Sequence, residues 1–146
     1  MNVTVGGWLV KYDAPGYREL RFSPGCFHES DRTIVPLVDA TRTGMRFCVT
    51  RDEIIGCAEI QEKEEGVWCE CCIRDTDQTK GYLRKIRFFP PRSFTFCANR
   101  IEQKPTRTGN KIVRGVIKTV GLDVTEVPTS VVERITIEKD KEETHA

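Results

Sequence analysis

Alternation of apolar and polar residues is the main pattern in the first half of the chain. Runs of this kind cover residues 3–12, 33–38, 45–50, 54–61 and 66–73. A period of two residues is typical of β-strands, because successive side chains point to opposite faces of a sheet. The polar residues 62–65 separate the last two runs and predict a β-hairpin. Gly6 and Gly7 predict a bulge or tight bend inside the first strand.

The period changes at Asp75, where Asp75, Thr76 and Asp77 resemble the start of a helix. Apolar residues then recur at helical spacing, at Tyr82, Leu83, Ile86 and Phe89. These two features predict one main helix over residues 77–88. Pro90 and Pro91 end it, because proline cannot continue a helix.

Strand patterns return after the two prolines, over residues 93–101, 111–120, 122–127 and 131–137, with a turn at 104–110. Residues 13–31 hold several prolines and glycines and predict a long loop with a short extended piece at 20–22. The order of elements predicts a mainly β (α+β) fold, an antiparallel β-barrel with one main helix packed outside it. We expect one domain over residues 1–138 and a charged, frayed tail over 139–146.

Composition fits an ordinary globular domain, with 146 residues, 38% hydrophobic and 31% charged residues, and a mean hydropathy of −0.41. No apolar stretch reaches the roughly 18–20 residues that a bilayer requires, and the first residues do not resemble a secretion signal. We therefore expect a protein that is neither secreted nor bound to a membrane. Seven cysteines are an odd number, and in a reducing compartment they predict free thiols, most of them buried.

The near-neutral net charge of +1 conceals a strongly basic segment. Residues 80–118 contain eleven Lys or Arg residues and one acid, Glu102. Such a segment favours contact with phosphate groups, with an acidic protein surface or with a second copy of the chain. The alternative is an ordinary solvated surface. The candidate binding residues in this segment are Lys80, Arg84, Lys85, Arg87, Arg92 and Arg100.

Candidate residues for metal binding or catalysis are few. The chain has two histidines, His28 in the long loop and His145 in the tail. Cys69 and Cys71 are expected to share one face of a strand, with side chains about 7 Å apart, while Cys72 points the other way. With no second thiol pair and no histidine nearby, we expect small buried side chains here, no metal site and no cofactor.

Several short motifs resemble, in their order and spacing, the prohead protease family of tailed bacteriophages, which shares a fold with the herpesvirus capsid-maturation proteases. Together they span residues 5–137. The motifs are Pro24-Gly25-Cys26-Phe27, Val35-Pro36-Leu37-Val38, Ile55-Gly56, Glu65-Gly66-Val67-Trp68, Asp75-Thr76, the run 93–101, Gly115-Val116-Ile117 and Val120-Gly121-Leu122.

The resemblance implies a serine peptidase that cleaves capsid and scaffold proteins with a serine, a histidine and a third orienting residue. Carried over to this chain, the histidine falls at Thr41, the nucleophile at Thr95 or, in another alignment, Ser93, and the third residue at Thr119. No base is present at these positions. Asp39 is nearby, but a carboxylate, with an ordinary pKa of about 4, is a poor base for a hydroxyl group.

The resemblance and the substitutions together predict a catalytically inactive relative of the prohead protease. Such a protein would act as a structural or binding module in phage head assembly, in the host cytoplasm or the virion head. Its expected partners are capsid or scaffold protein and further copies of itself. One alternative is an active serine or threonine peptidase that uses Ser93 or Thr95 with His28 as the base. Another is a nucleic-acid-binding domain that uses the segment 80–118.

Overall fold

A computed structural model describes residues 2–12, 20–44, 49–107, 109–127 and 129–138. Within these residues the fold is mainly β, with eight strands and two short α-helices. The strands are β1 (Asn2–Lys11), β2 (Arg21–Phe22), β3 (Ile34–Asp39), β4 (Ile54–Glu62), β5 (Gly66–Ile73), β6 (Ser93–Thr106), β7 (Gly109–Asp123) and β8 (Val132–Glu138). The helices are α1 (Ala40–Thr43), α2 (Lys80–Lys85) and two 3-10 turns, η2 (His28–Ser30) and η3 (Arg51–Glu53).

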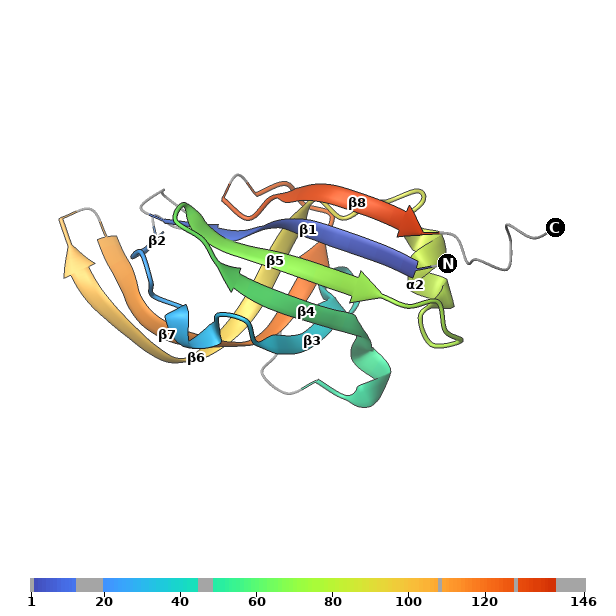
Figure 1. Cartoon of the computed structure of the whole chain (residues 1–146), viewed down its shortest axis with the longest axis horizontal. Helices are drawn as coiled ribbons and strands as arrows, with labels where there is room; N and C mark the ends of the chain where they lie inside the picture. The colour runs from blue at the N-terminus through green and yellow to red at the C-terminus, as the bar shows by residue number, and fades with distance from the viewer. Residues whose placement is uncertain (1, 13–19, 45–48, 108, 128, 139–146) are drawn as a thin grey trace.

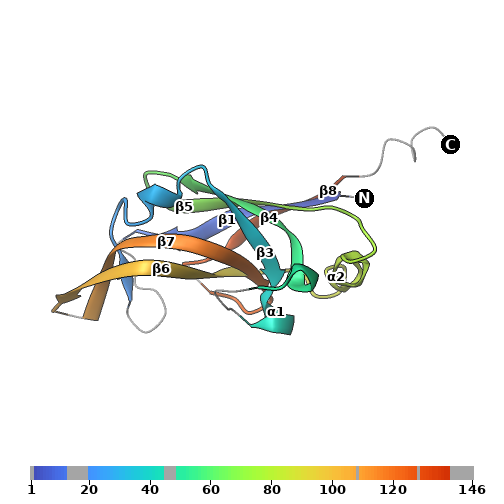
Figure 2. The same ribbon diagram turned by 90° about the horizontal axis from the view of Figure 1, so that it is seen from below.

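All eight strands belong to one curled sheet, in the order β2-β7-β3-β4-β5-β1-β8 (Figures 1 and 2). β2 and β3 pair with the same edge of β7, and β6 pairs with its other edge. The sheet approaches closure where Ser93 bridges Val131 and the Val132 N–H donates to the Arg92 carbonyl. This contact is local, and the strands form an open path. The predicted closed barrel is therefore not confirmed. The purely antiparallel arrangement is wrong, because β2 and β3 both pair in parallel with β7.

The core lies inside the curl of the sheet. Val3, Val5 and Leu9 of β1 point inward together with alternate residues of β4 and β5, all of them almost fully buried. Phe27 packs against Phe96 with ring centroids 5.5 Å apart. This alternation is the one that the sequence shows, so the strands and hairpin predicted for 54–61 and 66–73 are confirmed.

The bulge predicted in β1 is also confirmed. The pairing of β1 with β8 shifts register between Gly6 and Gly7. A Cβ atom on Gly7 would lie 2.2 Å from the Val131 carbonyl oxygen. Glycine at this position therefore allows β8 to begin close against β1.

Two predicted elements, the helix and a turn, differ in the structure. The helix covers residues 80–85 rather than 77–88, because Thr79 Oγ1 donates to the Arg74 carbonyl and holds residues 76–79 in a turn. At its other end Phe89 is 63% exposed, so its helical spacing does not reflect burial. Residues 104–110 are mostly strand, because β6 and β7 extend to Thr106 and Gly109 and form one long hairpin.

Two further expectations concern single strands. The strand predicted at 45–50 is wrong for residues 49–50, which are not extended in the sheet, and residues 45–48 lie outside the described residues. The strand predicted at 122–127 is wrong beyond Asp123, where β7 ends in a bend capped by the Thr125 N–H donating to the Asp123 carboxylate. Within the described residues, no helix is long and apolar enough to cross a membrane.

Candidate functional site

The candidate nucleophile positions lie at the start of β6, directly beside β7. Ser93 aligns with Asp123 and Thr95 aligns with Gly121. Because side chains two residues apart on a strand share a face, both hydroxyl groups lie on one side of the sheet. Ser93 is 1% exposed, and Thr95 is half-buried beside a glycine that carries no side chain.

A pocket of about 450 Å³ includes both residues in its lining. Its lining is mainly apolar and aromatic on one side and polar on the other, where the segment after β7 returns toward β8. The lining residues are Val10, Leu20, Phe22, Ser93, Phe94, Thr95, Phe96, Asp123, Thr125, Val127, Thr129 and Ser130. A mostly apolar pocket with a few hydroxyl and carboxylate groups is the usual form of a site for a small molecule or a peptide side chain.

Thr41, the position that corresponds to the histidine, belongs to a compact hydrogen-bond network. Its backbone N–H and its hydroxyl group donate to Asp39 Oδ1 at 3.1 and 2.5 Å, and Asp39 caps the start of α1. Lys85 Nζ of α2 donates to Asp39 Oδ2 at 2.9 Å and to Thr41 Oγ1 at 2.5 Å. We call Asp39, Thr41 and Lys85 the clasp, because they join α2 to the end of β3.

Tyr82 lies on α2, the same helix as Lys85 of the clasp. Burial raises the pKa of its phenol above the ordinary value, and the negative charge of Asp39 raises it further. Asp39 itself is only 6% exposed. Thr41, where the sequence resemblance places a histidine, is thus bonded to both members of the Asp39–Lys85 ion pair.

Thr119, the third position, is 1% exposed on β7 and aligns with Cys97 of β6. It lies two residues from Gly121, so it shares a face with Thr95 on the neighbouring strand. β3 pairs with the same part of β7, with Asp39 aligned with Leu122. The structure thus places all three positions on three adjacent strands or directly after them, and each one is a threonine.

His28, the fallback base, lies elsewhere. It is exposed on η2, and its Nδ1–H donates to the Gly25 carbonyl at 3.1 Å. The same turn is attached farther along β7, where Ser30 Oγ accepts from the Ile117 N–H. Ile117 is four residues, or roughly 13 Å, from Gly121 along the strand. The structure does not bring His28 to the hydroxyl groups of Ser93 and Thr95.

The basic segment does not form one continuous surface. Lys80, Arg84, Lys85 and Arg87 lie on α2 or directly after it, at one end of the molecule (Figure 1). Arg92 lies directly before β6, next to Val132. Lys85 belongs to the clasp, and Lys80 pairs with Asp77 at 3.1 Å. Arg100 lies on the β6–β7 hairpin, which extends toward the opposite end.

The cysteine cluster on β5 faces two ways, as expected. Cys69 and Cys71 point inward and are almost fully buried, and their sulfur atoms lie 3.5 Å apart, closer than the expected 7 Å. The contact with Cys69 and burial raise the pKa of the Cys71 thiol. In the part of the chain that the structure describes, no three His, Cys, Asp or Glu residues are grouped as metal ligands.

Sequence reasoning missed two residues of this region. Asp123, opposite Ser93, is the only carboxylate among the described residues that line the pocket, and nothing in the sequence aligns those two strands. The role of Lys85 was also missed, because its partner Asp39 is 46 positions away. A lysine on the buried side of a short helix is a weak signal for such a partner.

Comparison with known proteins gives a structural relative only. No family model and no curated protein matches this sequence. The structure is similar to that of the protease of the herpesvirus KSHV, solved in complex with a hexapeptide phosphonate inhibitor, with a TM-score of 0.53 at 12% sequence identity. The match covers 84% of this chain but 59% of that protease. The chain therefore has an assemblin-like fold, which is the fold of this herpesvirus protease.

Proposed function

We propose that this protein is an assemblin-like module without peptidase chemistry, which binds peptide segments of capsid or scaffold proteins during phage head assembly. Two features support the proposal. A mainly apolar pocket includes Ser93 and Thr95 in its lining, and the structurally similar herpesvirus protease was solved with a hexapeptide phosphonate inhibitor. The histidine position is Thr41, which belongs to the clasp.

The clasp is the observation that carries the proposal. A serine or threonine hydroxyl attacks a peptide bond only when an adjacent base accepts its proton. In the clasp, Lys85 Nζ donates to both Asp39 and Thr41, so it acts as a hydrogen-bond donor and not as an acceptor. Asp123, opposite Ser93, accepts from the Thr125 N–H at 3.1 Å, and a carboxylate alone is a poor base for a hydroxyl.

Binding without cleavage needs only the pocket. Its apolar wall, which includes Phe22, Phe94 and Phe96, suits an apolar side chain, and its hydroxyl groups suit a peptide backbone. A bound peptide would keep its scissile bond intact, because the hydroxyl group beside it is not activated. The module would then position a capsid or scaffold segment rather than process it.

A fluorophosphonate probe tests the chemistry directly. We expect no labelling of the protein under conditions in which an active serine peptidase is labelled completely. Co-expressed capsid and scaffold proteins from the same genome should stay intact. Stoichiometric labelling that is lost in Ser93→Ala or Thr95→Ala would overturn the proposal in favour of an active peptidase.

The binding half of the proposal needs a separate experiment. Thr95→Arg places a long side chain in the pocket, and we expect it to weaken capture of capsid or scaffold protein by about tenfold or more. Thr106→Arg adds the same charge at the exposed end of the β6–β7 hairpin and serves as the matched control. Equal capture by both variants and the unchanged protein would show that this pocket is not the binding site.

A further inference from the structure

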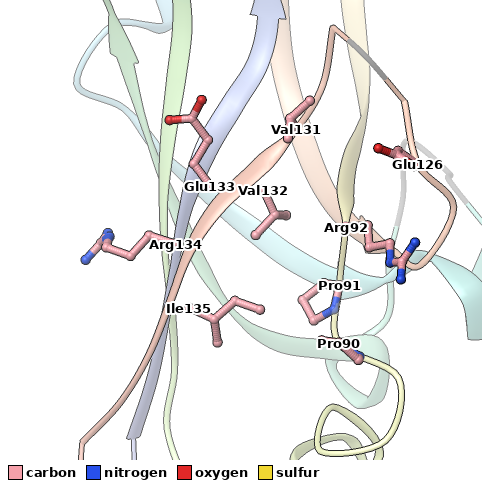
Figure 3. A pocket seen from close by; sticks show the side chains of 9 residues that line it. All are labelled: Pro90, Pro91, Arg92, Glu126, Val131, Val132, Glu133, Arg134 and Ile135. Atoms are coloured by element: carbon pink, nitrogen blue, oxygen red, sulfur yellow. The ribbon is translucent and has the colours of Figure 1, made fainter.

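The two ends of the basic segment differ in the acids that accompany them. At the α2 end, Lys80 pairs with Asp77 and Lys85 pairs with Asp39. A pocket of about 410 Å³ beside Pro90 and Pro91 is balanced as well, because its lining includes two arginines and two glutamates, Arg92, Arg134, Glu126 and Glu133 (Figure 3). Much of the positive charge in this part of the molecule is therefore matched by carboxylates of the same chain.

The other end of the segment carries its charge on the β6–β7 hairpin. Residues 99–114 hold five Lys or Arg residues and one acid, Glu102. Arg114 pairs with that acid and with Glu29. We call residues 103–111 the arm. The arm contains no Asp or Glu and three basic residues, Lys104, Arg107 and Lys111. Positive charge is thus concentrated in the part of the hairpin farthest from the ion pair.

The arm extends beyond the rest of the sheet (Figures 1 and 2). Residues 103–107, 109 and 110 are all exposed, and among the described strands β6 pairs with β7 alone. At its base a bulge interrupts the pairing between Asn99 and Glu102, and Arg100 has a left-handed φ of 52°. A bulge bends a strand. A two-stranded ribbon that is open on both faces fits the major groove of DNA, which is about 12 Å wide.

The basic residues of the arm lie close together. Lys104 and Lys111 are aligned directly across the two strands, so their side chains share one face of the ribbon, with Cα atoms about 5 Å apart. Like charges in this arrangement disfavour the strand pair. Arg107 follows β6 directly, in the turn at the tip. A phosphate group near the two lysines would offset their repulsion.

The other side chains of the arm favour duplex DNA over a protein or a single strand. Gln103 and Asn110 are of the types that donate to phosphate and sugar oxygens. The centre of a protein interface is typically rich in aromatic residues and poor in lysine. No Phe, Trp or Tyr follows Phe96 in the chain, so the arm also lacks the aromatic rings on which unpaired bases stack.

We propose that the arm binds the phosphate backbone of double-stranded DNA, without sequence preference, through Lys104, Arg107 and Lys111. The ribbon lies in the major groove, and its basic side chains reach the phosphates beside it. This activity is separate from the proposed peptide binding, because Ser93 and Thr95 lie at the start of β6 and the arm lies at its end. Either activity can therefore be lost without the other.

The salt dependence of DNA binding tests the proposal. We expect the full chain to bind a labelled duplex of about 30 base pairs with a micromolar Kd at about 50 mM salt, measured by fluorescence anisotropy. Each phosphate contact contributes about 0.9 to the slope of log K against log salt. The double variant Lys104→Gln, Arg107→Gln should therefore have a slope less steep by about 1.8 and an affinity lower by about tenfold or more.

The matched control removes the same charge from the other end of the basic segment. The double variant Lys80→Gln, Arg84→Gln changes α2 and should keep the slope of the unchanged protein. Circular dichroism should show that both double variants are folded. If the two double variants lose affinity equally, or if the unchanged protein does not bind the duplex at about 50 mM salt, the proposal is wrong.

Competition distinguishes duplex DNA from other polyanions. Unlabelled duplex should displace the labelled duplex more effectively than polyglutamate of equal total charge or a single strand of equal length, because a duplex carries one charge per about 1.7 Å of its axis. Equal displacement by polyglutamate would identify an acidic polypeptide as the partner and overturn the proposal. Tighter binding of the single strand would contradict the major-groove geometry and overturn it as well.

Discussion

The Thr41 region and the Thr95 region, the two halves of the proposed site, differ in how their polar groups are used. The Thr41 hydroxyl contacts both other members of the clasp, a carboxylate and an ammonium group. Thr95 instead lines an open pocket, half-buried beside Gly121. In the proposed function, a site without a base thus uses one half as structure and the other half for binding.

The largest effect should come from removing the carboxylate of the clasp. Asp39→Ala leaves Lys85 without its anion and α1 without its cap, so we expect a loss of about 2–3 kcal/mol in the free energy of unfolding. The measurement is urea denaturation followed by circular dichroism. Asp77→Ala is the matched control, because Asp77 is fully exposed in its pair with Lys80 and should cost less than about 0.5 kcal/mol. Equal losses would show that the clasp is an ordinary surface pair.

A second comparison changes Thr41 and Thr95, one at a time, to valine, which has nearly the same shape as threonine. Thr41→Val removes a hydroxyl group that is bonded to both Asp39 and Lys85, so we expect about 1 kcal/mol of destabilisation. Thr95→Val should stay within about 0.5 kcal/mol of the unchanged protein, because Thr95 lines a pocket rather than a packed core. The same urea titrations measure both values. A larger loss at Thr95 would contradict the division between a structural and a binding half.

The smallest effect is absent at neutral pH and appears in alkaline solution. Burial and Asp39 raise the pKa of Tyr82, so above pH 10 the unfolded chain releases this proton while the folded chain retains it. The contribution of Tyr82 to stability should therefore be constant below pH 10 and be lost as the pH rises toward the folded pKa. Tyr82→Phe should reduce this fall, measured by urea denaturation at pH 8, 10 and 11. Some loss should remain, because burial also raises the pKa of Tyr12. An identical fall in both proteins would exclude a role for Tyr82.

Local patterns in the sequence predict where the strands lie along the chain better than they predict which strands pair with one another. The alternation over 54–61 and 66–73 reflects which side chains face the core, and both strands and their hairpin form as expected. The parallel pairing of Leu37–Asp39 with Val120–Leu122 joins segments far apart in the chain. No local pattern encodes that contact, so the predicted antiparallel closed barrel differs from the open sheet.

The site shows the same limit. The motifs that place Thr41, Thr95 and Thr119 are local, and the structure positions all three on neighbouring strands or directly after one. The contacts that decide what they do are distant in sequence, because Lys85 reaches Asp39 from a helix 46 positions away. For the same reason the basic residues, adjacent in sequence, divide between α2 and the β6–β7 hairpin.

The pairing of β1 with β8 and of β3 with β7 also bears on how fast the chain folds. Asn2 aligns with Glu138, and Leu37 aligns with Val120. Contacts of such long sequence separation require a large loss of chain entropy before they contribute any stabilisation, so proteins built on them fold in milliseconds to seconds rather than microseconds. Until residues 132–138 are in place, the backbone edge of β1 stays open to other chains.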